Sequence, residues 1–237
     1  MTKDVDIVDL KTRTKACVFD AYGTLFDLAS AAMAATDEFS ENMGTKTTQL
    51  SQIWRTKQIE YSWIRTMMGE HKDFWQVTGD ALDFAMEHLE LDSEALRDRL
   101  MELYFTLDAF PEVYEVLSQL KQAGLKTAIL SNGSPEMLQG AIGHSNITDL
   151  LDEVYSIEQI GIYKPDPRVY RIAVDGLGLA PENICFVSAN GWDVAGGANL
   201  GLSVIWVNRY KQVPERLPGL PLHEISDLKA LPELLGI

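Results

Sequence analysis

Four short, mainly apolar runs stand out along the chain. They cover Ala16–Phe19, Lys126–Leu130, Ile184–Val187 and Ser203–Val207. The runs are rich in Val, Ile and Phe and do not alternate with polar residues, which is typical of parallel strands that are covered on both faces. We therefore predict that the four segments are buried strands of one sheet.

Helical patterns separate the last three of these runs. Apolar residues recur at helical spacing in residues 135–145 after the second run, in residues 167–178 before the third, and in residues 193–201 after it. This alternation of strand and helix predicts an α/β fold with a doubly wound, mostly parallel, Rossmann-like sheet.

Residues 28–108 follow a different pattern, because they contain no convincing strand. Apolar residues recur there at helical spacing in three successive groups. We interpret the segment as a helical subdomain inserted between the first strand and the rest of the sheet. The core domain would then consist of residues 14–27 and 109–237, and residues 1–13 would form a loose N-terminal tail.

The charge of the chain limits its partners. The 237 residues include 35 acidic and 20 basic ones, for a formal net charge of −15. Such a surface repels nucleic acids and anionic membranes, so we expect neither as a partner. No stretch reaches the roughly 18 apolar residues that a membrane span needs. The N-terminal residues also lack the apolar segment of a signal peptide, and we expect a cytoplasmic location.

The cysteines and histidines give no sign of a metal site. Cys17 and Cys185 lie inside the first and third apolar runs, and we expect them to be buried free thiols. The chain has no Cys-X-X-Cys motif, and its four histidines lack the spacing of metal ligands.

Polar residues follow the apolar runs at the points where the predicted strands end. In open α/β sheets ligands bind beyond the carboxyl ends of the strands, so these side chains are expected to meet at one edge. Each has an ordinary explanation by itself, as a turn residue, a helix cap or a solvated charge, and only their combination indicates a site. They are Asp20 after the first run, Ser131 and Asn132 after the second, Ser188, Asn190 and Asp193 after the third, and Lys164 in the preceding loop.

At these positions the chain resembles the haloacid dehalogenase superfamily. The four motifs of that superfamily correspond to DAYGT at 20–24, SNG at 131–133, YKPD at 163–166 and SANGWD at 188–193. Their order and spacing fit, and the four together are far more specific than any one of them. The predicted helical insert corresponds to the cap subdomain of the superfamily.

Two departures separate the chain from the phosphatases of the superfamily. Their DxDGT motif carries a second Asp that acts as acid and base, and this chain has Tyr22 at that position. The first carboxylate of their GDSxxD motif falls on Ala189, which leaves Asp193. The resemblance therefore implies an enzyme that uses neither a metal nor another cofactor.

The closer resemblance is to the (S)-2-haloacid dehalogenases, and only the N-terminal tail lies outside it. It includes WRTKQIEYSWIRTMM at 54–68 and the longer stretches around the other motifs. It implies hydrolysis of short-chain (S)-2-haloalkanoic acids to (R)-2-hydroxyalkanoic acids and halide, with a small halogenated carboxylic acid as the partner. A homodimer is also suggested, by the resemblance and by the aromatic-rich insert.

This reading gives the strand-end residues their roles. Asp20 would be the nucleophile, which forms an ester as the halide leaves. Asp193 would position or deprotonate the water that attacks the ester, helped by Thr24, Ser188 and Asn190. Inversion at carbon occurs once, which explains the change from an (S) acid to an (R) product.

Arg55 is expected to stabilise the departing halide, with Asn132 and Phe74 as its companions. Counting by four along the predicted helix places Arg55 on one stripe with Ile59 and Trp63. An arginine on such a stripe is unusual for a purely solvated face. The alternative is an arginine that extends across apolar neighbours to reach solvent.

The substrate carboxylate needs hydrogen-bond donors. Ser131 and the backbone N–H groups at the start of the helix at 135–145 suit an anion. Lys164 would neutralise the negative charges around it. Tyr170 would hold Lys164 or Asp193 in place, unless it is simply a packing residue. The residues expected to shape the apolar wall of the site are Tyr22 and Trp192.

Two other functions stay open. A phosphatase acting on a small phosphate ester is disfavoured by Tyr22 and Ala189. A catalytically silent binding or structural protein remains an alternative because a fold does not determine a function, although such a protein would be expected to lose some of the strand-end residues. Chloride release from (S)-2-chloropropionate, with p-nitrophenyl phosphate as the control, separates the three readings.

Overall fold

In the part of the chain that the structure describes, six parallel strands form one sheet, in the order β3-β2-β1-β4-β5-β6. The computed structural model describes residues 10–39 and 46–237. The predicted α/β fold with a doubly wound parallel sheet is confirmed. The strands are β1 (Ala16–Phe19), β2 (Lys126–Ser131), β3 (Glu153–Ser156), β4 (Ile184–Ser188), β5 (Ser203–Val207) and β6 (His223–Ile225).

The four strands predicted from apolar runs are β1, β2, β4 and β5, and the prediction missed both edge strands. Every residue of β1, β4 and β5 is buried, which explains their continuous apolar sequences. The edge strands β3 and β6 are short and partly exposed, and they include Glu153 and His223. Such segments carry too little apolar sequence to stand out from loops.

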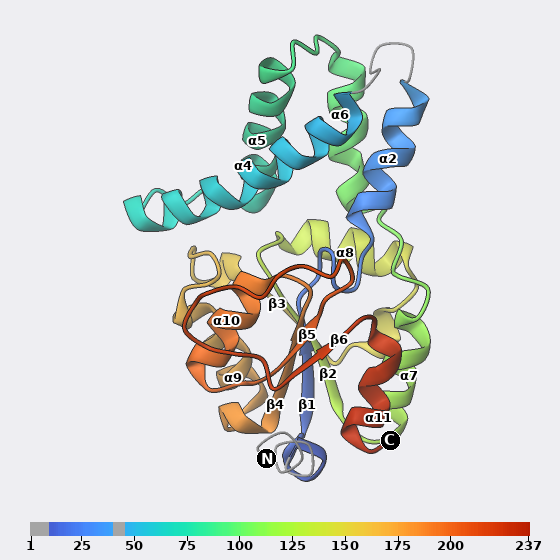
Figure 1. Cartoon of the computed structure of the whole chain (residues 1–237), viewed down its shortest axis with the longest axis vertical. Helices are drawn as coiled ribbons and strands as arrows, with labels where there is room; N and C mark the ends of the chain where they lie inside the picture. Colours follow the sequence, from blue (N-terminus) through green and yellow to red (C-terminus); the bar gives the residue numbers. More distant parts are fainter. Residues whose placement is uncertain (1–9, 40–45) are drawn as a thin grey trace.

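Helices cover both faces of the sheet. Figure 1 shows α9 and α10 on one side and α7 and α11 on the other. The predicted helices at 135–145, 167–178 and 193–201 correspond to α8, α9 and α10, and α10 begins two residues earlier than expected. The helices of this layer are α7 (Val113–Gln122), α8 (Pro135–His144), α9 (Pro167–Leu177), α10 (Gly191–Leu200) and α11 (Leu231–Leu235).

A second group of helices lies over the carboxyl end of the sheet (Figure 1). The chain enters and leaves this group side by side, because the N–H of Asp27 donates to the carbonyl of Asp108 at 2.9 Å and Phe110 donates to Leu25 at 2.9 Å. Within the described part of 28–108 every regular element is helical, and the division into core and cap stays our interpretation. The elements are α2 (Leu28–Glu38), α4 (Lys46–Met68), α5 (Phe74–His88), α6 (Glu94–Glu102) and the 3-10 helix η1 (Leu103–Phe105).

The expectation of a loose tail is wrong for residues 10–13. These residues are helical, Leu10 is completely buried, and the Thr14 hydroxyl donates to the Leu10 carbonyl at 2.7 Å. The apolar residues Val5, Ile7, Val8 and Leu10 are too few and too irregularly spaced to predict an element, so the sequence pattern did not reveal the burial of Leu10. Residues 1–9 of the predicted tail lie outside the described residues.

Cys17 and Cys185 are buried free thiols, as predicted. They are register partners on the neighbouring strands β1 and β4. Among residues 10–39 and 46–237, no helix combines the length and apolar character of a membrane span. The cytoplasmic location stays a prediction.

Candidate active site

The candidate site lies where the central strands β1, β2 and β4 end. Asp20 directly follows β1, and its N–H donates to the Val187 carbonyl of β4 at 2.9 Å. Ser131 and Ser188 are the last residues of β2 and β4. Because all three strands are parallel neighbours, residues far apart in the chain meet at this edge.

Three side chains hold the Asp20 carboxylate. Its Oδ2 accepts hydrogen bonds from the Thr24 hydroxyl at 3.0 Å and from Asn190 Nδ2 at 2.9 Å. Its Oδ1 accepts from Lys164 Nζ at 3.1 Å. The side chain of Asp20 is only 9% exposed, so these donors replace water around the charge and orient both oxygens.

Lys164 joins Asp20 to a second carboxylate. Its Nζ lies 2.9 Å from Asp193 Oδ2, and the Lys164 side chain is only 1% exposed. Burial acts to lower the pKa of Lys164, but the charges of Asp193 and Asp20 outweigh burial and the pKa lies above its ordinary value. The lysine is therefore a fixed positive charge between the two acids.

Asp193 is completely buried and is held from two sides. Tyr170 donates its hydroxyl to Asp193 Oδ1 at 2.7 Å, while Lys164 binds the other oxygen. A Cβ at Gly196 would clash with the Tyr170 hydroxyl oxygen, so glycine is needed for this approach. Burial and the neighbouring charge of Asp20 raise the pKa of Asp193 against the opposing effect of Lys164. A raised pKa makes its carboxylate a stronger base.

Hydroxyl groups fix the loop after β4. The Thr24 oxygen accepts the N–H of Ala189 at 2.8 Å while its hydroxyl binds Asp20. The Ser188 oxygen accepts the N–H of Asn190 at 3.1 Å. Thr24 and Ser188 thus position Asn190, which in turn holds Asp20.

The residues after β2 are held in the same way. The Ser131 oxygen accepts the N–H of Gly133 at 3.1 Å, and Ser131 is completely buried. Asn132 Oδ1 accepts the backbone N–H of Lys164 at 3.0 Å. The Asn132 amide nitrogen is therefore oriented away from the backbone of Lys164. Ser131 and Asn132 both line the small cavity at Asp20.

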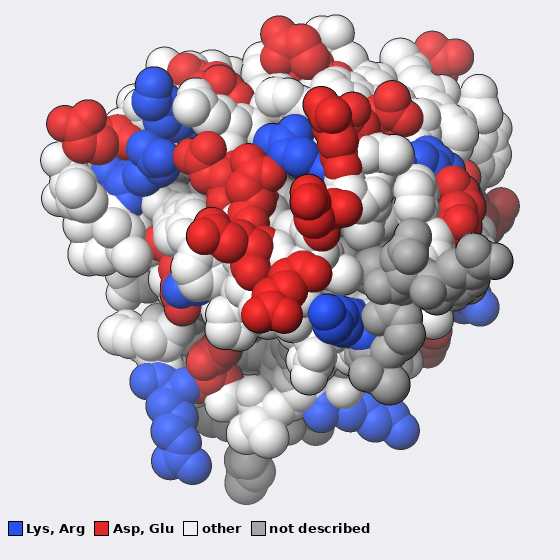
Figure 2. Space-filling model, turned by 90° about the horizontal axis from the view of Figure 1, so that it is seen from above, with Lys and Arg blue, Asp and Glu red and all other residues white. Residues whose placement is uncertain are grey.

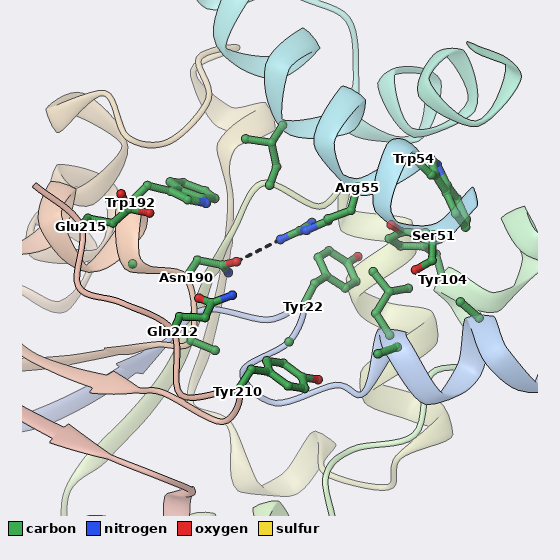
Figure 3. A pocket seen from close by; sticks show the side chains of 17 residues that line it. Tyr22, Ser51, Trp54, Arg55, Tyr104, Asn190, Trp192, Tyr210, Gln212 and Glu215 are labelled. Atoms are coloured by element: carbon green, nitrogen blue, oxygen red, sulfur yellow. Dashed lines mark hydrogen bonds between the residues drawn. The ribbon is translucent and has the colours of Figure 1, made fainter. Parts of the chain in front are cut away.

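Arg55 reaches the site from helix α4. Its Nη2 donates to Asn190 Oδ1 at 3.2 Å, and its Nη1 donates to Gln58 Oε1 at 2.7 Å. Figure 3 shows the side chains of Arg55 and Asn190 pointing toward one another across the pocket. The arginine therefore lies in the site and is not a solvated residue of the helix surface.

Aromatic rings form the wall around these polar groups. The ring of Tyr22 stacks on Phe74 with centroids 6.1 Å apart and meets Tyr104 edge-on at 5.2 Å. Trp192 packs edge-on against Trp63 at 5.5 Å. The Tyr22 hydroxyl is buried and has no hydrogen-bond partner. The burial of its ring raises the pKa of Tyr22, which stays protonated.

Two adjoining cavities open at this point. The smaller, of about 20 Å³, lies against Asp20 and is also lined by Arg55, Phe74, Ser131 and Asn132. The larger, of about 390 Å³, lies between helices α2 and α4 and the loop after β5 (Figure 3). Both are lined by the residues Tyr22, Arg55, Ile59, Asn190 and Trp192.

The surface around the site contrasts with its interior. Figure 2, which looks down on the helices over the sheet, shows acidic side chains gathered at the centre of that face. Two cations lie at the site, the buried Lys164 and the partly buried Arg55. An anionic ligand would therefore be attracted by local charges inside the site and not by the surface as a whole.

Sequence reasoning placed every predicted site residue near this edge but missed a layer behind Arg55. Gln58 and Tyr104 contact one another at 2.8 Å, and Gln58 binds Arg55. The only available signal was a glutamine three residues after Arg55, on the same face of one helix.

The acidic residues of the site do not fit a divalent metal ion. Mg²⁺ requires several oxygen ligands in near-octahedral geometry, and Ala189 stands where the phosphatase motif supplies a carboxylate. The ammonium of Lys164 already bridges Asp20 and Asp193. Within the described residues no group of three His, Cys, Asp or Glu side chains is arranged to hold a metal.

Known proteins are similar in sequence to this chain over most of its length. The family model for haloacid dehalogenase-like hydrolases matches residues 14–201. The chain is 46% identical over 222 residues to (S)-2-haloacid dehalogenase 1 of Pseudomonas sp. (strain CBS-3). The aligned region covers 93% of this chain and 96% of that protein.

Solved structures share the fold as well. One is a dehalogenase crystallised with an intermediate complex, at a TM-score of 0.91 and 44% identity, covering 95% of this chain and 98% of that one. Another is the L-2-haloacid dehalogenase from Xanthobacter autotrophicus with chloropropionic acid covalently bound, at a TM-score of 0.86 and 35% identity, covering 94% and 98%. The chain therefore belongs to the family of haloacid dehalogenase-like hydrolases, as its four motifs indicated.

Proposed function

We propose that this protein hydrolyses short-chain (S)-2-haloalkanoic acids to (R)-2-hydroxyalkanoic acids and halide, through an ester on Asp20. The observation that carries the proposal is the pairing of the buried Asp20 carboxylate with the partly buried Arg55 guanidinium across one small cavity. Asn190 connects the two, because it donates to Asp20 and accepts from Arg55. This arrangement provides a nucleophile on one side and an acceptor for a departing anion on the other.

In the first step an oxygen of Asp20 attacks the carbon that carries the halogen. The new carbon–oxygen bond forms as the carbon–halogen bond breaks, and the bonding pair leaves with the halide. Arg55 stabilises the negative charge that develops on the halogen, and Asn132 and Phe74 line the same small cavity. One displacement with inversion converts an (S) centre to an (R) centre.

In the second step water attacks the carbonyl carbon of the Asp20 ester. The acyl carbon–oxygen bond breaks, so the product keeps the oxygen that attacked and the enzyme keeps the oxygen of water. Asp193 takes the proton of this water, to which its raised pKa suits it, and returns a proton to the departing oxygen of the hydroxy acid. Tyr170 and Lys164 hold Asp193 in place for the reaction.

The substrate carboxylate is bound by donors at the end of β2. Ser131 lines the small cavity, and the backbone N–H groups before α8 lie next to it in sequence. Lys164 offsets the negative charges of the two aspartates, which favours the entry of a further anion. Tyr22 and Trp192 provide the apolar wall beside the carbon chain.

The names of the relatives support this proposal. The curated protein from Pseudomonas sp. (strain CBS-3) is an (S)-2-haloacid dehalogenase, and the Xanthobacter autotrophicus structure carries covalently bound chloropropionic acid. A covalent adduct in a relative that is 35% identical is the outcome that an attacking carboxylate produces. The homodimer stays a prediction, which sedimentation velocity can test.

The test of the function is halide release. Purified protein is incubated with (S)-2-chloropropionate, and released chloride and the configuration of the lactate are measured. We expect chloride and (R)-lactate from the (S) acid, little reaction with the (R) acid, and no hydrolysis of p-nitrophenyl phosphate. Phosphate release without chloride release would restore the phosphatase reading, and inactivity toward both would favour a binding protein.

A further inference from the structure

Gln58 is completely buried directly behind Arg55, at a point where three helical segments meet. Its side chain makes hydrogen bonds with all three partners in reach. Oε1 accepts from Arg55 Nη1 at 2.7 Å, and Nε2 donates to Thr78 Oγ1 and to the Tyr104 hydroxyl, each at 2.8 Å. Arg55 and Gln58 lie on α4, Thr78 lies on α5 and Tyr104 lies on η1.

The hydrogen bonds fix which way the Gln58 amide faces. The Thr78 hydroxyl donates its own hydrogen to the Phe74 carbonyl at 2.6 Å, so its oxygen can only accept from Gln58. The amide nitrogen must then lie on the Thr78 side, and the amide oxygen must face Arg55. A reversed amide would place N–H donors against the guanidinium and leave both unsatisfied.

This acceptor determines where the guanidinium of Arg55 can lie. Gln58 accepts a hydrogen bond from Nη1 and Asn190 accepts one from Nη2, so these two contacts fix the plane of the forked guanidinium. The fork borders the small cavity in which we place the halide. Gln58 is neutral, so it orients Arg55 without cancelling the positive charge that a developing halide needs. A carboxylate at this point would pair with that charge.

We propose that Gln58 is a positioning residue for dehalogenation, which sets Arg55 in the geometry that receives the leaving halide. The inference rests on the proposed function, since it concerns the same site. The competing explanation is that Gln58 only joins the helices. A structural role alone predicts lower stability but gives no reason for an effect that depends on the identity of the halogen.

The test uses the full-length protein in single turnover, with enzyme in excess over (S)-2-chloropropionate or (S)-2-bromopropionate. Chloride is the poorer leaving group, so it depends more on a well-placed Arg55. We expect Gln58→Met to slow chloride release on the order of tenfold, less than the 10²–10³ that loss of a donor costs, and to slow bromide release less. The ratio of bromide to chloride rates should therefore rise.

Leu50→Ala is the matched control, because Leu50 is buried on the same helix and lines neither cavity. It should lower the melting temperature and leave the rate ratio at the wild-type value. If circular dichroism shows Gln58→Met to be unfolded, Thr78→Val is used instead, since it removes one partner of the Gln58 amide. The same rise in the ratio is expected from it, though smaller.

A double-variant cycle completes the test. In an Arg55→Lys background, Gln58→Met should change chloride release little, because the contact it removes is already altered. An unchanged rate ratio in the folded Gln58 variant, or an equal change in Leu50→Ala, would overturn the positioning role while the wild type still releases halide. Absence of halide release by the wild type would instead refute the proposed function itself.

Discussion

Lys164 Nζ lies 3.1 Å from Asp20 Oδ1, although 144 residues separate the two along the chain. The lysine stands on a loop before α9, and the aspartate follows the central strand β1. Such a buried ammonium offsets the negative charge of the carboxylate through a hydrogen bond, whereas a metal ion would coordinate the carboxylate oxygen directly.

We predict covalent catalysis by Asp20. Asp20→Asn keeps the shape of the side chain but removes the charged nucleophile, so halide release should fall to background while the fold is retained. In a single turnover in heavy-oxygen water, mass spectrometry of the wild type should find the label in the Asp20 carboxylate. Label appearing first in the hydroxy acid would mean that water attacks the substrate directly.

Arg55→Lys should be a poor enzyme despite keeping the charge. The planar fork of Arg55 contacts Gln58 and Asn190 together, and a lysine ammonium cannot span both. We expect a loss of turnover on the order of 10²–10³, measured as chloride release at saturating substrate. Near wild-type turnover would show that the guanidinium does not receive the halide.

Activity should not depend on a divalent metal. Lys164 supplies the positive charge between Asp20 and Asp193, and Ala189 removes one expected metal ligand. Halide release should be unchanged after dialysis against EDTA and should not increase when Mg²⁺ is added. Loss of activity with EDTA and recovery with Mg²⁺ would favour the alternative that the site belongs to a phosphatase.

The acid limit of turnover should be set by Asp193. Burial raises the pKa of Asp193, so this base becomes protonated, and turnover is lost, at a higher pH than for an exposed aspartate. Tyr170 opposes the shift by donating to the ionised form. Tyr170→Phe should move the acid limb of the pH–rate profile to higher pH, since it removes a hydrogen bond that favours the ionised form of Asp193. An unmoved limb would remove Asp193 from the role of base.

Stability should depend on the buried ion pair between Arg209 and Glu112. The two side chains are 9% and 7% exposed and lie 2.7 Å apart, and Arg209 also donates to the Thr24 carbonyl at 2.8 Å. Arg209→Met leaves Glu112 as an uncompensated buried charge and should lower the free energy of unfolding in urea by about 3–5 kcal/mol.

The same pair should give a pH dependence of stability. Burial acts to raise the pKa of Glu112, but the hydrogen bond and charge of Arg209 together with backbone hydrogen bonds outweigh burial, and the pKa is lowered. The contribution is therefore present above the pKa of an unfolded glutamate and is lost as the pH falls through the lower folded value. Adding Glu112→Gln to Arg209→Met should recover part of the stability, and a further loss in the double variant would contradict the argument.

The central part of the fold was predictable from the sequence because strands that are buried on both faces have continuous apolar sequences. The strands β1, β4 and β5 must be apolar at every position, so they stand out as continuous runs. The edge strands β3 and β6 face solvent in part, so they have no continuous apolar run. The burial of Leu10 was not predicted either, since the few apolar residues of its segment show no regular period.

The position of the site could be predicted from the sequence, because parallel strands end at one edge and polar residues follow β1, β2 and β4 there. Which atoms meet at that edge depends on the folded structure. Arg55 reaches Asn190 across 135 residues, and Gln58 faces Thr78 and Tyr104 from a neighbouring helix. Hydrophobic periodicity states which face of a helix is buried, but partners in a polar network depend on how the helices pack, and that is a property of the folded chain.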